Sequence, residues 1–414
     1  MIKNNKLKIV IVGHVDHGKS TLIGRILYDT KMINSDKLKD MVDKDDNIDF
    51  SFFTDHFEEE REQRITIDTT QIFFKTNKRE YIIIDAPGHN EFINNMVTGA
   101  AQAGAAILIV DACEGIQEET KRHACILSLL GIKQVIIAIN KMDLVNYDST
   151  VYQKIVDDLG DFLDKINISN RTYIPIVAKD GDNVVKESEN IKWYKGHTII
   201  ELLDVLSEEI KHEEMFTIFP VQDVIIKKMP SSINRIFLGQ LISGNLSVND
   251  EICVLPSKQV TTVKSIEKFN ETPQTIEIGE CCGLTVEKPL FLERGSIIAS
   301  MNNSLYISNK IIVTLFALSD INLNSGDRLY IICSTQKIAC NIDNIVFKMN
   351  SSTLQKTNKN NIREIEKYEV AKVEISTKVS MVHSIINELM DMSKIVIVKN
   401  NSVCATGTVV DRIS

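Results

Sequence analysis

Hydrophobic runs of strand length alternate with stretches of helical periodicity over the first half of the chain. The strand-length runs are KIVIV, REYIIIDAPG, AAILIVDA and QVIIAIN, and the helical pattern covers residues 19–28, 120–130 and 198–212. Strands that alternate with helices form a mostly parallel sheet with helices on both faces. The pattern therefore predicts an α/β domain over residues 1–212.

The pattern changes after residue 215 to short β-rich runs separated by turn residues. One set, which includes FPVQDVII, FLGQLISGNL, DEICVL and ECCGLTVE, predicts a β-barrel over residues 215–302. A second set includes KIIVTLFAL, DRLYIICS, YEVAKVEI and VCATGTVV, and it predicts another all-β barrel over residues 307–414. Within that barrel, the polar stretch 350–361 is predicted to be a long hairpin loop.

Length and composition agree with a globular protein of two or three domains, because the chain has 414 residues, 43% of them hydrophobic. The sequence has no run of apolar residues long enough for a membrane helix and no signal-peptide core, so we expect a cytoplasmic protein. Its net charge of -9 argues against a large nucleic-acid surface, although a local basic patch stays open. Its eight cysteines lack zinc spacing and are predicted to be buried, reduced thiols.

The first motif with a chemical meaning is GHVDHGKST at residues 13–21, between a predicted strand and a predicted helix. It fits the phosphate-binding pattern G-x-x-x-x-G-K-[ST]. Gly13 and Gly18 let backbone N–H groups approach phosphate oxygens, while Lys19 reaches the β and γ oxygens and Ser20 offers a hydroxyl to Mg2+. The other candidate residues of this loop are His14, Val15, Asp16, His17 and Thr21.

Two further motifs predict a switch and a hydrolytic centre. In DAPGH, Asp85 suits a water on Mg2+, the N–H of Gly88 senses a γ-phosphate, and His89 orients the attacking water. In EREQRITID, the hydroxyl of Thr66 coordinates Mg2+ when the γ-phosphate is present. The polar residues 28–57 are predicted to be a switch segment that GTP orders.

The motif NKMD at the end of QVIIAIN predicts which base is bound. The carboxylate of Asp143 accepts hydrogen bonds from N1–H and the exocyclic amine of guanine, a pair of donors that adenine lacks. The amide of Asn140 contacts O6 and N7. The phosphates are therefore predicted to belong to GTP, and the α/β domain is predicted to be a P-loop GTPase.

These motifs together resemble the translational GTPases of the elongation factor Tu and 1A type over essentially the whole chain. The resemblance implies that Lys19 and Ser20 bind phosphate and Mg2+, that Thr66 binds Mg2+, and that His89 positions water. It also implies guanine contacts from residues of NKMD and of the loop VAK, and these residues are Asn140, Lys141, Asp143, Ala178 and Lys179.

Finer phrases resemble the regulatory GTPase subunit of heterodimeric ATP sulfurylase, also called sulfate adenylyltransferase subunit 1. They include STLIGRILYDTK, DFSFFTDHFEEEREQ, LERGSIIAS and REIEKYEVAKVEI. The resemblance implies that GTP hydrolysis drives the formation of adenosine 5'-phosphosulfate and pyrophosphate from ATP and sulfate on a separate catalytic subunit. Some relatives carry an adenylylsulfate kinase domain after the third domain. Since this sequence stops at Ser414, we expect that activity to need a separate kinase.

Two positions depart from the wording of that family. Arg64 stands where glycine is common, so a positive φ there would be strained and switch timing would change. Val177 stands where a serine is usual. Because the expected contact to guanine O6 is the backbone N–H of Ala178, the missing serine hydroxyl is expected to weaken loop ordering more than base choice. Two alternatives stay open: an elongation factor that delivers aminoacyl-tRNA, and a GTP-dependent scaffold without sulfurylase activity.

Overall fold

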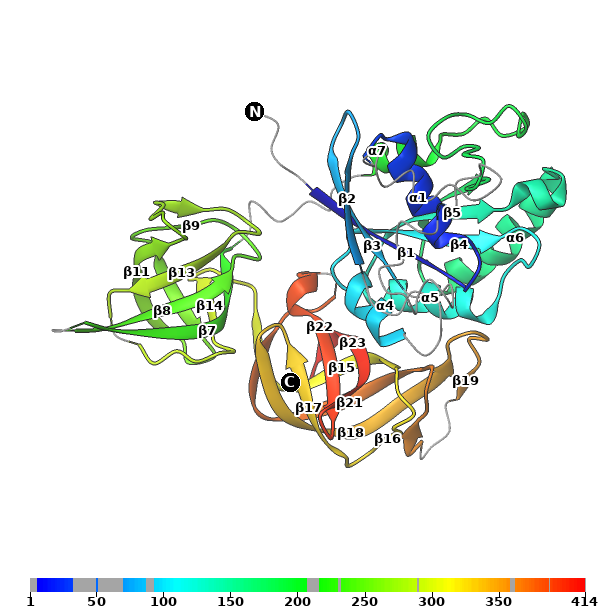
Figure 1. Cartoon of the computed structure of the whole chain (residues 1–414). Helices are drawn as coiled ribbons and strands as arrows, with labels where there is room; N and C mark the ends of the chain where they lie inside the picture. Colours follow the sequence, from blue (N-terminus) through cyan, green and yellow to red (C-terminus); the bar gives the residue numbers. More distant parts are fainter. Residues whose placement is uncertain are drawn as a thin grey trace. The chain divides into compact units, whose positions relative to one another are not determined.

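The computed structural model forms two compact units (Figure 1), residues 1–208 with 351–354 and residues 209–350 with 355–414. The residues that the structure describes are 6–32, 50, 70–86, 93–206, 216–229, 232–288, 290–357, 362–386 and 388–413. Both barrels lie in the second unit, so the division into two units does not test the three domain ranges 1–212, 215–302 and 307–414. Those ranges stay a prediction.

The first unit contains a six-stranded sheet in the order β2-β3-β1-β4-β5-β6, in which only β2 runs antiparallel to its neighbour. The strands are β1 (Lys6–Gly13), β2 (Thr70–Lys75), β3 (Glu80–Asp85), β4 (Ala105–Asp111), β5 (Gln134–Asn140) and β6 (Asn170–Pro175). The helices are α1 (Lys19–Asp29), α4 (Ile93–Ala100), α5 (Glu118–Leu129), the 3-10 turn η3 (Met142–Val145), α6 (Ser149–Lys165) and α7 (Ile199–Val205).

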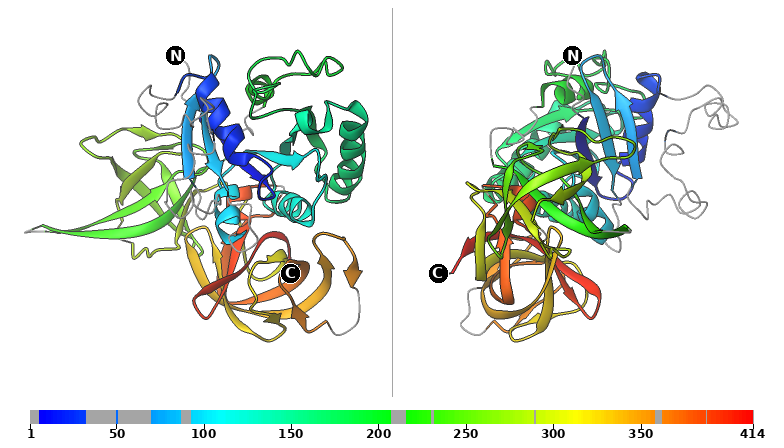
Figure 2. Two further views of the ribbon diagram at one scale, coloured as in Figure 1. Left: turned by 45° about the vertical axis from the view of Figure 1, so that its right-hand side comes forward. Right: turned by 90° about the vertical axis from the view of Figure 1, so that its left-hand side faces the viewer.

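The central strands of this sheet are apolar along their whole length because helices cover both faces. Every residue of β4 and of β5 is buried. Helices α1 and α7 share one hydrophobic cluster with the sheet, whereas α4 and α5 lie on its other face (Figures 1 and 2). The predicted parallel α/β architecture is confirmed.

Two helices differ from the sequence prediction. Helix α7 begins after Thr198, whose side chain forms a capping box with Glu201, and it ends at Val205 rather than at residue 212. Residues 207–212 of that prediction lie outside the described residues. Helix α6 was not predicted, although Asp148 caps it by accepting a hydrogen bond from the N–H of Thr150.

The first barrel of the second unit closes through six strands in the order β10-β11-β13-β8-β7-β14, with β10 paired to β14. All of its described pairings are antiparallel. Its strands and the short β9–β12 pair are β7 (Ile218–Met229), β8 (Ser232–Gln240), β9 (Leu246–Ser247), β10 (Glu251–Leu255), β11 (Gln259–Glu267), β12 (Thr275–Ile276), β13 (Cys281–Val286) and β14 (Ile297–Ser300).

The second barrel is also antiparallel, and pairing of β17 with β18 closes it. Its elements are β15 (Tyr306–Ala317), β16 (Leu323–Asn324), β17 (Arg328–Cys333), β18 (Gln336–Asn350), β19 (Lys356–Thr357), β20 (Glu364–Ile365), β21 (Glu369–His383), the 3-10 turn η4 (Met390–Met392), β22 (Lys394–Lys399) and β23 (Ser402–Arg412). The predicted loop 350–361 is wrong in part, because β19 pairs back onto β18 within it. Residues 358–361 lie outside the described part of the chain.

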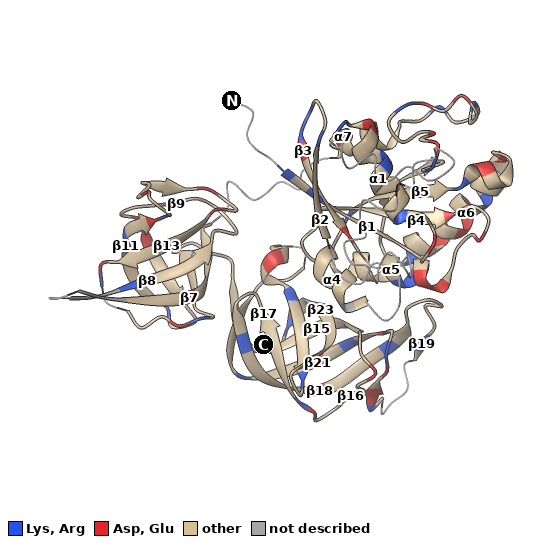
Figure 3. Cartoon of the chain, in the orientation of Figure 1, with Lys and Arg blue, Asp and Glu red and all other residues tan. Residues whose placement is uncertain are grey.

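The cysteine prediction is confirmed for six residues and wrong for two. All eight cysteines are free, but Cys113 and Cys281 are exposed. Cys281 and its buried neighbour Cys282 are consecutive in β13, and consecutive side chains of a strand point to opposite faces. Charged residues of both signs are interspersed along the chain (Figure 3), and Nζ of Lys348, for example, lies 3.0 Å from Oε2 of Glu369.

Candidate nucleotide-binding site

The loop between β1 and α1 has the backbone form that phosphate binding needs. Gly18 adopts φ 95°, and a Cβ there would collide with the side-chain amide of Asn140. A Cβ on Gly13 would lie only 2.7 Å from the carbonyl oxygen of Ile109. Among the described residues, no side chain caps the start of α1, so its first N–H groups suit an anion.

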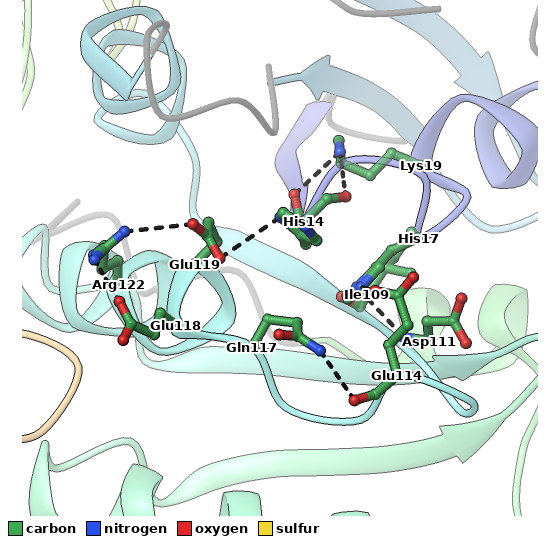
Figure 4. A network of polar contacts seen from close by, with 11 residues as sticks. His14, His17, Lys19, Ile109, Asp111, Glu114, Gln117, Glu118, Glu119 and Arg122 are labelled. Carbon is green, nitrogen blue, oxygen red and sulfur yellow. Dashed lines mark hydrogen bonds and ion pairs between the residues drawn. The ribbon is translucent and has the colours of Figure 1, made fainter.

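Lys19 is buried beneath this loop and forms hydrogen bonds with its backbone. Its Nζ donates hydrogen bonds to the carbonyl oxygens of Gly13, at 3.0 Å, and His14, at 2.9 Å (Figure 4). Burial lowers the pKa of Lys19 to about 8, although the charges of Asp85 and Asp16 oppose that shift. A bound phosphate would therefore take the place of these two carbonyl oxygens as the hydrogen-bond partner of the Lys19 ammonium.

This depressed pKa predicts how nucleotide affinity depends on pH. Phosphate oxygens stabilise the protonated form of Lys19. At a pH above its pKa of about 8 in the free protein, Lys19 must therefore take up a proton when the nucleotide binds. We expect GTP affinity to be nearly constant from pH 6.5 to 7.5 and about 10-fold weaker at pH 9. Fluorescence titration with a labelled GTP analogue would measure it, and equal affinity at pH 7 and pH 9 would contradict the assignment.

Two histidines of the loop connect it to the region around α5 (Figure 4). His17 is fully buried, its Nε2 lies 3.1 Å from Oε2 of Glu114, and burial lowers its pKa. His14 lies edge-on to His17, and its Nδ1 is 3.7 Å from Oε2 of Glu119. These contacts hold the phosphate loop against the region around α5. The sequence motif did not predict a role for Glu114 or Glu119.

Asn140 joins three parts of the site. Its Nδ2 donates to the carbonyl oxygen of His17, and its Oδ1 accepts from the N–H of Ala178, both at 2.9 Å. The side chain at the end of β5 thus holds the phosphate loop and the VAK loop in one arrangement. The N–H of Ala178, predicted to contact guanine O6, donates to Asn140 in this structure.

Lys141 and Asp143 follow directly after β5. Lys141 adopts φ 63°, and its Nζ lies 2.6 Å from Oδ2 of Asp111 at the end of β4. Burial alone raises the pKa of Asp111, but hydrogen bonds from Lys141 and the N–H of Cys113 hold that pKa below its usual value. Asp143 is half-buried in η3. Asp111, which lies outside the sequence motifs, thus positions Lys141.

The VAK loop is ordered without the usual serine hydroxyl. Val177 is buried, its N–H donates to Asp182 at 3.2 Å, and its carbonyl accepts from Gly181 at 2.8 Å. Ala178 is buried and Lys179 is exposed. Backbone hydrogen bonds therefore hold this loop in the structure.

The other predicted residues divide into described and undescribed ones. Asp85 is buried at the end of β3, and Ser20 and Thr21 are half-buried in the first turn of α1. Val15 is half-buried, and Asp16 is exposed with φ 61°. Four residues lie outside the described part of the chain, namely Arg64, Thr66, Gly88 and His89.

Two negative findings apply to the described residues alone. Within those ranges, no three or more His, Cys, Asp or Glu side chains are grouped to hold a metal ion. The helices that the structure describes include none long and apolar enough to cross a membrane.

Parts of this chain match two protein families. Residues 4–217 match the elongation factor Tu GTP binding domain, and residues 310–410 match the GTP-eEF1A C-terminal domain-like family. Sulfate adenylyltransferase subunit 1 of Francisella tularensis subsp. novicida is 35% identical over 89% of this chain and 79% of its own. The protein of that name from Aliarcobacter butzleri is 36% identical over 87% of this chain and 78% of its own. Among solved structures, sup35 complexed with GDP is 21% identical with a TM-score of 0.46, covering 99% of this chain and 95% of that one. The chain belongs to the sulfate adenylyltransferase subunit 1 family.

Proposed function

We propose that this protein is the GTP-hydrolysing regulatory subunit of a sulfate adenylyltransferase. The observation that carries the proposal is a hydrogen bond from the side chain of Asn140, in the guanine-type motif NKMD, to the carbonyl oxygen of His17 in the phosphate loop. The chain that contains this bond belongs to the sulfate adenylyltransferase subunit 1 family. Hydrolysis of GTP drives formation of adenosine 5'-phosphosulfate and pyrophosphate from ATP and sulfate. Because the chain has one phosphate loop and that loop belongs to a guanine site, the adenylation site lies on a separate catalytic subunit.

In this proposal, residues of the first unit hold a GTP molecule with Mg2+. Backbone N–H groups from Gly13 to Thr21 and the Lys19 ammonium hold the phosphates, while Asn140, Lys141 and Asp143 hold guanine. Hydroxyls of Ser20 and Thr66, and Asp85 through a water, would hold Mg2+. When bound, Mg2+ neutralises charge that develops between the β- and γ-phosphates.

The hydrolytic step is assigned to the DAPGH segment. His89 orients the water that attacks the γ-phosphate, and the N–H of Gly88 detects whether that phosphate is present. Positioning of the water and stabilisation of charge account for most catalysis of this kind. Loss of the γ-phosphate then releases the segment that contains Thr66.

The product of the catalytic subunit passes to other proteins in this proposal. We assign the protein to the cytoplasm, where ATP and GTP are available, in a heterodimer with the adenylyltransferase. Phosphorylation of the adenylylsulfate product falls to a separate kinase. Aminoacyl-tRNA delivery and a scaffold role are the competing functions.

Capture of the tagged protein from its native cells with a non-hydrolysable GTP analogue tests the partner. We expect a stoichiometric adenylyltransferase to be recovered with the analogue. The same capture from a strain with Asp143→Asn serves as the control, because that variant should no longer bind the analogue. Recovery of aminoacyl-tRNA without an adenylyltransferase would contradict the proposal and support the delivery function.

A further inference from the structure

Arg25 on α1 reaches across to the VAK loop of the guanine site. Its Nη1 donates a hydrogen bond to the carbonyl oxygen of Lys179 at 3.2 Å, although the two residues are 154 positions apart in the sequence. Lys179 directly follows Ala178, whose N–H donates to Asn140. A side chain of α1 therefore fixes the backbone next to the group that was predicted to contact guanine O6.

The guanidinium of Arg25 is itself held on several sides. Its Nε donates to Oδ2 of Asp29 at 2.9 Å, one helical turn further along α1. Its centre lies 5.7 Å from the ring centroid of Tyr28 and 5.4 Å from that of Phe50. The Arg25 side chain is 20% exposed and that of Asp29 is 18% exposed, so the pair is largely shielded from water.

Glycines allow the close approach of the chain to Arg25 and to α1. Gly181 has φ +87°, and a Cβ on it would lie 2.5 to 2.6 Å from atoms of the Arg25 guanidinium. A Cβ on Gly24 would collide with the backbone oxygen of Phe50, so that buried phenylalanine also packs tightly on α1. The loop and the helix are therefore complementary in shape around Arg25.

We propose that Arg25 is a positioning residue for guanine recognition. Val177 has no hydroxyl with which to order the VAK loop, and the planar fork of Arg25 supplies a fixed donor from outside the loop. Arg25 holds the carbonyl of Lys179, which fixes the backbone beside Ala178, and the N–H of Ala178 in turn holds the amide of Asn140 in the base-binding motif. This role rests on the proposed assignment of the site to guanine nucleotides.

The test compares GDP binding by the full-length wild type with that of Arg25→Ala. We expect dissociation of a fluorescent GDP analogue to become about 10-fold faster, and Kd to rise by the same factor, which corresponds to about 1.4 kcal/mol. At saturating GTP, kcat is expected to stay within about 2-fold while KM rises, because Arg25 does not touch the phosphates. A lower kcat with an unchanged KM would overturn the positioning role.

Two further variants separate this role from general stability. Arg171→Ala is the matched control, because Arg171 also donates to a backbone carbonyl, that of Ile168 at 2.7 Å, and its side chain is 16% exposed. Arg171 lies at the amino end of β6, whereas the VAK loop follows the carboxyl end of that strand. Arg171→Ala should therefore lower the melting temperature without changing the Kd for GDP.

Arg25→Lys keeps the charge but cannot bond both Asp29 and Lys179 through a rigid fork. We expect its Kd for GDP to lie between those of the wild type and Arg25→Ala, and this variant decides the question if Arg25→Ala does not fold. A wild-type Kd in Arg25→Lys and Arg25→Ala would refute the role of Arg25. Failure of the wild type to bind GDP would instead refute the guanine site itself.

Discussion

Replacing Asp143 with Asn is expected to lower the affinity for GTP by at least about 100-fold and to allow xanthosine triphosphate to bind instead. The carboxylate accepts two hydrogen bonds from guanine, and each bond to a charged group contributes about 1.5 to 3 kcal/mol. An amide offers one acceptor and one donor, which matches the xanthine edge better. Competition of GTP and xanthosine triphosphate for a fluorescent analogue measures the exchange of preference.

The matched control for that experiment is Asp148→Asn, five residues further along the chain. Asp148 caps α6 through the N–H of Thr150, and asparagine is an equally good cap. Its GTP affinity should therefore equal that of the wild type. Unchanged affinity and base preference in Asp143→Asn would remove Asp143 from base recognition.

Replacing His89 with Ala is expected to leave GTP bound but to slow its hydrolysis by about 100-fold. A group that orients water or transfers its proton commonly contributes 10² to 10⁴ in rate, while the residues proposed to hold the phosphates and the base are unchanged in this variant. Single-turnover hydrolysis of prebound GTP separates this effect from affinity.

His197→Ala is a suitable control for the His89 experiment. His197 is largely exposed, with its Nδ1 3.5 Å from Glu201, so its loss should not change the hydrolysis rate. A wild-type rate in His89→Ala would mean that another group orients the water. A loss of GTP binding in that variant would mean that His89 belongs to the binding site instead.

Much of this site could be predicted because its residues end neighbouring parallel strands. Gly13, Asp85 and Asn140 stand at the carboxyl ends of β1, β3 and β5, which meet at one edge of the sheet. Each strand is a continuous apolar run, so both its position and the residue that follows it are visible in the sequence. The motifs then supply the chemistry.

Other parts of the site could not be predicted because they depend on contacts between distant residues. Nothing in the local pattern around Arg25 indicates the carbonyl of Lys179, and its spacing to Asp29 is typical of any helical ion pair. Asp111 ends an apolar strand, but its partner Lys141 follows a different strand. The exposure of Cys113 likewise follows from its place in a loop beyond β4.

The measurement that tests the account most directly is adenylylsulfate formation by this protein together with its adenylyltransferase partner. Adenylation of sulfate is strongly uphill, so the partner alone should stop at a small yield. With GTP present, we predict that adenylylsulfate accumulates well beyond that yield while GTP is hydrolysed, and that a non-hydrolysable analogue gives no increase. Equal yields with and without GTP would contradict the coupling of hydrolysis to sulfate activation.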